Sequence, residues 1–212
     1  MNERAKTRRL TTPLDDGQVR ALKSGDRVLL SGVILTGRDA AHKWMVDTFI
    51  EKTRLADGDD EKVYHSIRQI LDGGVIYHCG PVVSGMESGQ YRFVAAGPTT
   101  SIREEPYQGA VLRHFNIKGV IGKGGMGEQT RLALQEVPAV YLHAVGGAGT
   151  LIAQCVRRVI AVYKLEFGVP EALWVIEVQK LPLVVTMDAY GSSLHESVQI
   201  ESKNHLSRLI TG

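Results

Sequence analysis

The sequence predicts a layered α/β domain built on a largely parallel or mixed sheet. Short apolar runs alternate with amphipathic segments, most regularly from Gln90 onward, and this order is typical of strand–helix units. The early strands lack long crossovers between them, so a second sheet or a hairpin layer is also expected. The chain has 212 residues, 43% of them hydrophobic, and can bury a substantial core in one domain, with two small domains as the alternative.

The first half of the chain alternates between helical and strand patterns. The expected elements are helices at 14–22, 40–55 and 63–71 and strands at 27–36 and 74–79. Asp39 is well placed to cap the second helix. Residues 56–62 are polar and acidic, so we expect a surface loop or an insertion there, with neutral decoration favoured over a partner contact.

The second half repeats strand and helix at short intervals. The expected strands are 90–96, 117–121, 138–144, 159–163, 173–178 and 183–187, and the expected helices are 106–115, 128–136 and one that starts near Gly149 and includes Val156. Residues 192–212 form an ambiguous C-terminal tail, with a loose helix as its structured alternative.

Composition excludes several classes of protein. A formal net charge of +2 is too small to indicate a nucleic-acid partner, and the basic run within residues 1–9 is interpreted as a disordered, solvated tail. No apolar segment follows that tail as a secretory signal, and no run approaches the ~18 apolar residues of a membrane span. Cys79 and Cys155 form neither a disulfide framework nor a metal-binding spacing, which favours a cytoplasmic protein with reduced thiols.

Two glycine-rich turns, at 97–103 and 122–127, predict a site for a small anion. Each turn combines small residues with one cation, Arg103 in the first and Lys123 in the second. Glycine lets backbone N–H groups approach a ligand, and the two cations supply positive charge. Arg38 follows a strand and precedes a helix, a position from which side chains reach sites in α/β folds.

Other interpretations of these residues stay open. Residues 122–127 fit the dinucleotide pattern G-x-G-x-x-G, but the next strand does not end in the acidic residue that would hold a ribose, and a purely structural turn is also possible. Thr100 or Ser101 could simply cap the following helix. Residues 146–149 could hold an anion or serve as a close-packing turn. The scattered histidines lack metal spacing and are interpreted as structural: His42, His78, His114 and His143.

Six motifs occur in order along the chain: TGRDAAH at 36–42, YHCGP at 77–81, GPTTSIR at 97–103, GKGGMG at 122–127, GGAG at 146–149 and GVPEALW at 168–174. Together they resemble the beta subunit, or C-terminal domain, of the iron–sulfur hydro-lyases, which comprise class I fumarases and L(+)-tartrate dehydratases. The resemblance implies a swivelling β/β/α domain over residues 10–191, with a mixed sheet and helices on one side. One departure is Glu104, which stands where the family usually has Met.

The resemblance also implies a half-enzyme. In the family a partner alpha subunit holds a [4Fe-4S] cluster through three cysteines, and this chain has only two cysteines. The expected assembly is a hetero-oligomer with two copies of each chain. By resemblance, Arg38, Arg103 and Lys123 bind the two carboxylates of a C4 diacid, and Arg103 also stabilises charge during catalysis. Thr99 corresponds to the base that removes a proton from the carbon next to the departing hydroxyl.

The function expected first is therefore fumarate hydratase, the reversible hydration of fumarate to (S)-malate. L(+)-tartrate dehydratase and a mesaconate-type hydratase are the enzymatic alternatives, since one methyl group changes pocket selectivity by only ~1–3 kcal/mol. The non-enzymatic alternative is a stand-alone nucleotide- or metabolite-binding module. The preferred diacid and the direction of the reaction stay open.

Overall fold

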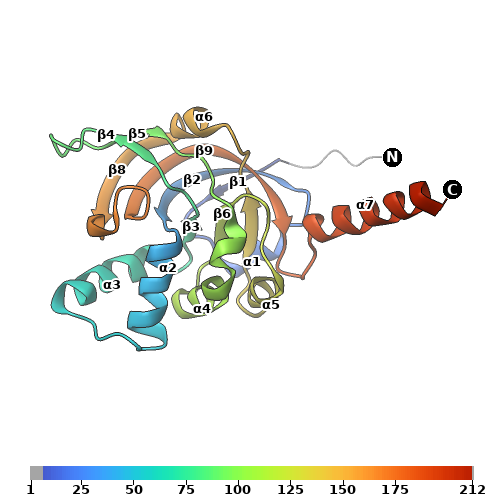
Figure 1. Cartoon of the computed structure of the whole chain (residues 1–212). Coiled ribbons are helices and arrows are strands. Elements are labelled where there is room, and N and C mark those ends of the chain that lie inside the picture. Colours follow the sequence, from blue (N-terminus) through green and yellow to red (C-terminus); the bar gives the residue numbers. More distant parts are fainter. Residues whose placement is uncertain (1–6, 212) are drawn as a thin grey trace.

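The computed structural model describes residues 7–211 and shows a curled sheet with most of its helices on one side (Figure 1). The strands of the main sheet are β1 (Thr7–Thr11), β2 (Arg27–Thr36), β3 (Val75–Tyr77), β6 (Gly119–Gly122), β7 (Val140–His143), β8 (Val156–Tyr163) and β9 (Leu173–Met187). Their order is β1-β2-β3-β6-β7-β9-β8, and β2 pairs with β9 as well. This additional pairing closes β2, β3, β6, β7 and β9 into a ring, so two β layers face each other. A separate ribbon pairs β4 (Val82–Ser84) with β5 (Arg92–Ala95).

The helices follow local capping signals in the sequence. They are α1 (Asp16–Arg20), α2 (Asp39–Met45), α3 (Gly58–Leu71), α4 (Glu105–Phe115), α5 (Glu128–Glu136), α6 (Gly149–Ala153) and α7 (Leu194–Thr211). Capping boxes start α1 at Asp15 and α3 at Asp57. α4 ends at Asn116, which adopts the left-handed conformation with φ 56°.

Strand alternation divides the apolar residues between two cores. On β9, Trp174 and Ile176 lie in an inner core between the β layers, whereas Leu173 and Val175 lie in an outer core under the helices. The buried apolar side chains of α2, α3, α4 and α5 join the outer core, which confirms the predicted β/β/α layering. The short helices α1 and α6 add to the inner core.

The structure differs from two of the expectations for the N-terminal part of the chain. Residues 1–6 of the expected basic tail lie outside the described residues, but Thr7–Thr11 form β1, parallel to the first half of β2. β3 pairs only with the last two residues of β2, so the edge along the first half of β2 is free for β1. The helix expected over 40–55 ends earlier, because α2 passes into a π-helical turn at Val46–Ile50 and Lys52 then takes φ 56°.

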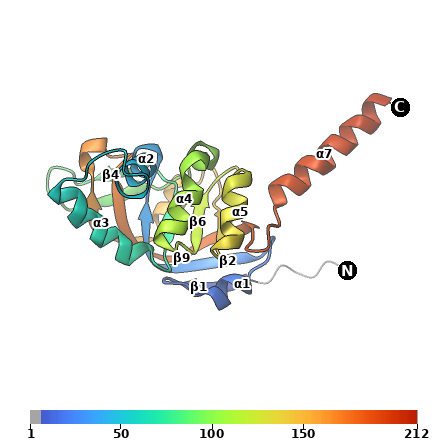
Figure 2. The ribbon, with the colours of Figure 1, turned by 90° about the horizontal axis from the view of Figure 1, so that it is seen from below.

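The late strands also differ from expectation. Residues 173–187 form one long strand, β9, where the sequence indicated two, because β9 continues through Lys180 (φ 53°) while still paired with β2. Val156, expected in a helix, begins β8. Part of the tail at 192–212 is α7, which projects away from the body (Figure 2). No helix within residues 7–211 is long and apolar enough to span a bilayer.

The acidic segment at 56–62 is not a surface loop throughout, because α3 already begins at Gly58. Its Asp60 carboxylate is buried and contacts Lys164 at 2.5 Å and Arg54 at 2.7 Å. Burial alone would raise the pKa of Asp60, but bonds from Lys164, Trp44 and other donors lower it to about 2. The segment therefore anchors α3, and the prediction of neutral decoration was wrong at this residue.

Candidate active site

The residues predicted from the sequence come from segments that meet at the carboxyl edge of parallel strands. Arg38 follows β2, and Lys123 follows β6. Thr99 and Arg103 lie in the segment between β5 and α4, which is hydrogen-bonded to the ends of β3 and β6. In open α/β sheets this edge is the usual place for ligands.

Direct hydrogen bonds join the two glycine-rich turns. The Lys123 N–H donates to the Thr99 carbonyl at 3.2 Å, and the Ser101 N–H donates to the Lys123 carbonyl at 3.1 Å. The Thr99 N–H and Oγ1 both donate to the His78 carbonyl, at 2.8 and 3.1 Å. His78 therefore fixes the rotamer of Thr99, a positioning role that no local sequence pattern indicated.

Arg38 is oriented by Glu171, from the loop before β9. The Arg38 Nη1 lies 3.2 Å from one Glu171 oxygen, and the other oxygen accepts the Ala40 N–H at 3.2 Å. Glu171 thus caps α2, while the expected cap Asp39 sits in the first turn and makes no capping bond. Gly80 lets the guanidinium approach, because a Cβ there would lie 2.5 Å from Arg38 Nη1.

The three cations are only partly neutralised by this chain. Arg38 Nε is buried and has no hydrogen-bond partner among residues 7–211. Arg103 Nη1 is 3.9 Å from Asp39 Oδ2, with both side chains nearly half exposed, and Lys123 has no ion pair within the described residues. A dicarboxylate would satisfy such donors better than water does, because each arginine can bind an oxygen pair.

A buried polar network supports the first turn. Ser101 does not cap the next helix; its Oγ contacts His78 Nδ1 and accepts from the Tyr141 hydroxyl, both at 2.8 Å. The Gln108 side chain bridges the Nε2 atoms of His78 and His42 at 2.8 and 3.0 Å. Burial lowers the pKa of both histidines, so each ring is neutral, which agrees with the predicted structural roles.

The G-x-G-x-x-G segment does not offer a free helix N-terminus. The Glu105 carboxylate accepts the Gly127 N–H at 2.8 Å and the Thr130 N–H at 3.2 Å, so an internal anion occupies the start of α5. This arrangement argues against a nucleotide phosphate there. The 146–149 turn leads into α6, where a Cβ at Gly149 would lie 3.3 Å from the Gly97 nitrogen, as in a close-packing turn.

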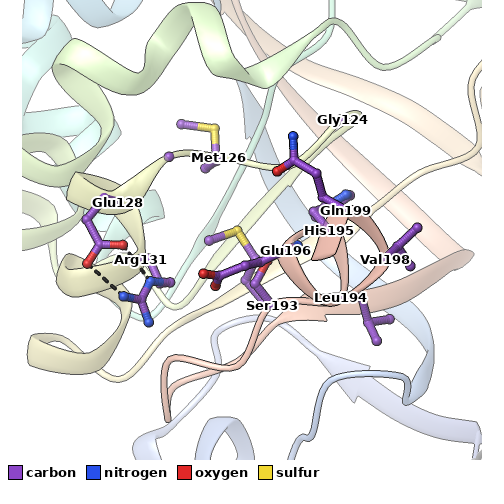
Figure 3. Close-up of a pocket in the computed structure, with 12 residues that line it drawn as sticks. Gly124, Met126, Glu128, Arg131, Ser193, Leu194, His195, Glu196, Val198 and Gln199 are labelled. Atoms are coloured by element: carbon purple, nitrogen blue, oxygen red, sulfur yellow. Dashed lines mark hydrogen bonds and ion pairs between the residues drawn. The ribbon is translucent and has the colours of Figure 1, made fainter. Parts of the chain in front are cut away.

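A pocket of ≈ 660 Å³ lies between the second glycine turn and the start of α7 (Figure 3). Figure 3 shows Gly124 and Met126 facing His195 and Glu196, with the Glu128–Arg131 ion pair at one end. The His195 ring packs against Gly125, where a Cβ would lie 2.5 Å from it, and its Nε2 is 3.0 Å from Thr186 Oγ1. The start of α7 thus supports the turn that carries Lys123.

The residues of this chain do not fit an iron–sulfur cluster. Cys79 is fully buried, and burial raises the pKa of its thiol to about 12, which disfavours the thiolate that a cluster needs. Cys155, the other cysteine, is far from Cys79 in the sequence and only partly buried. Within residues 7–211 no three His, Cys, Asp or Glu side chains are grouped so that they could hold a metal ion.

Comparisons with known proteins define the class. The family described as the fumarase C-terminus matches residues 1–198. The chain therefore belongs to the family of fumarase C-terminal domains. Among its relatives, a putative class I fumarate hydratase of Geobacillus stearothermophilus is 46% identical over 94% of this chain, and the chain spans only 35% of that relative.

Two further relatives are named as separate subunits. The putative L(+)-tartrate dehydratase subunit beta of Methanocaldococcus jannaschii is 36% identical over 91% of this chain and 93% of the relative. The L(+)-tartrate dehydratase subunit beta of Escherichia coli K12 is 31% identical over 87% of this chain and 85% of the relative. The family resemblance drawn from the six motifs is therefore confirmed.

Proposed function

We propose that this chain is the beta subunit of a cytoplasmic hydro-lyase that interconverts fumarate and (S)-malate. The observation that carries the proposal is the convergence of Arg38, Arg103 and Lys123 on one sheet edge, where the buried Nε of Arg38 has no partner among the described residues. Three cations offset the two charges of a C4 dicarboxylate. Fumarate is favoured over tartrate because the relative with 46% identity is named as a fumarate hydratase.

The chain's own residues account for substrate binding and proton removal. The arginines and Lys123 hold the carboxylates and stabilise the negative charge that develops when a proton leaves the adjacent carbon. Thr99 is proposed as the base. Its hydroxyl donates to the His78 carbonyl, which orients Oγ1 in the neutral form. The nearby cations favour release of the hydroxyl proton to solvent, and the resulting alkoxide would take the substrate proton at Oγ1 and return to the hydroxyl.

The remaining parts are proposed to come from a partner. Since this chain's cysteines do not fit a [4Fe-4S] cluster, we place the cluster on a cysteine-bearing alpha subunit, in an assembly with two copies of each chain. The names of the tartrate dehydratase relatives as beta subunits support a hetero-oligomer. L(+)-Tartrate dehydratase is the second candidate function, because those relatives match most of the length of both chains.

The ligand roles are tested by alanine substitution in the assembled enzyme. Arg38→Ala or Arg103→Ala should reduce kcat/KM by about 10²–10⁴-fold, because each removes charge that stabilises the transition state. Arg158→Ala is the matched control, since Arg158 is an exposed arginine on the edge strand β8 and pairs with Glu177 of β9. Normal kcat/KM in either site variant, with assembly intact, would remove that arginine from the site.

The base is tested by isotope exchange. Thr99→Val keeps the shape of the side chain but should abolish exchange of the substrate proton with deuterated solvent while substrate still binds. Thr53→Val, at an exposed threonine, is the control. Retained exchange in Thr99→Val would show that another group is the base.

A further inference from the structure

Glu104 presents a buried carboxyl group that the mechanism above does not use. The residue is completely buried, in the 3-10 turn Ser101–Glu104, directly after Arg103. Neither of its carboxyl oxygens has a hydrogen-bond donor within the described residues, and the same holds for the buried Oδ1 of Asp39. Buried oxygens without partners are rare in proteins, so these three require an explanation.

The two carboxyl groups lie next to each other and next to Arg103. α2, which carries Asp39, packs against the 3-10 turn, and Asp39 is the side chain that contributes most, after burial, to the raised pKa of Glu104. The other oxygen of Asp39, Oδ2, lies 3.9 Å from Arg103 Nη1. Glu104, Asp39 and Arg103 therefore form a short row that runs from the buried interior to the exposed guanidinium.

A single proton on the Glu104–Asp39 pair accounts for the hydrogen bonds that the buried oxygens lack. Two neighbouring ionised carboxylates would repel each other, and burying an ionised carboxylate that has no hydrogen-bond donor destabilises the folded state. If Glu104 is protonated, its hydroxyl can donate to Asp39, so the pair carries a single negative charge. Burial, reinforced by the neighbouring Asp39, raises the pKa of Glu104 to about 8, so the protonated form prevails at neutral pH.

The other groups near Glu104 are consistent with this state. The Arg103 guanidinium favours ionisation, but its effect is smaller than that of burial. The Tyr141 phenol faces Glu104 from β7, and burial raises the pKa of this phenol, so it stays neutral. His42 and His78, from α2 and the end of β3, are neutral members of the adjacent network.

We propose that Glu104 and Asp39 share one proton and that this acid pair positions Arg103 for the substrate. With one proton in the pair, Arg103 meets a single charge at 3.9 Å and is free to bind the substrate carboxylate. When the proton is lost, the pair becomes doubly negative and draws the guanidinium away from the substrate. The role of Arg103 as a substrate ligand rests on the proposed function, whereas the shared proton does not.

The shared proton is tested on the full chain by thermal unfolding across pH. Unfolded glutamate has a pKa of about 4.3, below that of folded Glu104, so the native state binds the extra proton between these values. Stability therefore falls as pH rises from about 4 to 8, because Glu104 ionises more readily once unfolded. In Glu104→Gln this pH-dependent loss of stability should be absent, because the amide does not ionise. Its Tm should match that of the unsubstituted chain near pH 4 and exceed it increasingly up to pH 8.

Positioning of Arg103 is tested by binding of succinate, a non-reacting C4 dicarboxylate, to the complex with the alpha chain. Its Kd should rise about tenfold between pH 7 and 9, as expected when only the protonated pair permits binding, and should stay nearly flat in Glu104→Gln. KM for fumarate should follow the same pattern while kcat changes less. Glu128→Gln, at an exposed carboxylate, is the control and should behave as the unsubstituted protein.

The outcomes separate this proposal from the proposed function. A Tm difference that does not change with pH would overturn the shared proton. A pH-dependent Tm difference with the same succinate pH profile in Glu104→Gln and the unsubstituted enzyme would overturn the positioning role. A complex that binds succinate with the predicted profile but turns over no diacid would support the acid pair and contradict the hydro-lyase assignment.

Discussion

Glu105 joins the two glycine-rich turns of the candidate site, and replacing it should lower the stability of the protein by a measurable amount. Its carboxylate accepts from Gly127 N, Thr130 N and Thr130 Oγ1, at 2.8, 3.2 and 2.7 Å. It thereby ties the segment after Arg103 to the start of α5 and the end of the second glycine turn. A hydrogen bond to a charged group contributes about 1.5–3 kcal/mol, and loss of a helix cap costs about 0.5–2 kcal/mol. Because these terms overlap, Glu105→Ala should lower the free energy of unfolding by about 2–4 kcal/mol.

The assay for Glu105→Ala is urea unfolding of the full chain, with a thermal scan in parallel. The m-value should stay constant, and Tm should fall by about 5–15 °C for a chain of this size. Glu128→Ala is the matched control, because Glu128 is also acidic in the first turn of α5 but is exposed and forms an ion pair with Arg131 of the same helix. A loss below about 0.5 kcal/mol, or one equal to that of the control, would refute the inference that Glu105 joins the two turns.

Two further substitutions test the packing around the site and the anchoring of α3. Asp60→Asn should lower the free energy of unfolding by about 1.5–3 kcal/mol at pH 7, because it removes the charged partner at 2.5 Å from Lys164 and leaves that ammonium with Glu166 alone, at 3.3 Å. The folded-state pKa of Asp60 is depressed to about 2, so its contribution is complete above about pH 4 and is lost as pH falls through 2; a difference unchanged down to pH 2 would contradict this. Gly122→Ala should lower the free energy of unfolding by about 1–3 kcal/mol and weaken substrate binding, because the added Cβ would lie 1.8 Å from Ser101 Oγ. Gly58→Ala, with open space around it, is the control for Gly122→Ala; equal urea midpoints would refute the close contact.

Local patterns predicted the elements whose signals are local. β2 and α5 match their expected ranges, because a continuous apolar run and a helical repeat with an acidic first turn depend on neighbouring residues only. β1 was missed because it exists through its pairing with the free edge of β2. The two expected late strands are one, because the cross-strand partner β2 holds β9 together through Lys180.

The parts of the candidate site that have local sequence signals were recognisable, and the parts that depend on distant segments were not. Arg38 and Lys123 were recognisable from strand ends and glycine turns, and in the structure they follow β2 and β6 directly. Glu171 was not recognised, because it acts on Arg38 and on the start of α2 from a distant loop. Asp60 was misjudged, because its burial depends on Lys164 from a separate part of the chain. Interactions between distant segments leave little trace in local sequence patterns.

The most direct test of the account is turnover by the reconstituted pair of chains. This chain would be co-expressed anaerobically with a cysteine-bearing alpha-type chain, the cluster rebuilt, and ultraviolet absorbance followed with fumarate, mesaconate and L-tartrate in parallel. The account predicts turnover that needs both chains and an intact cluster, with fumarate as the fastest substrate. Turnover of none of the three by a properly assembled pair would contradict the proposed hydro-lyase function.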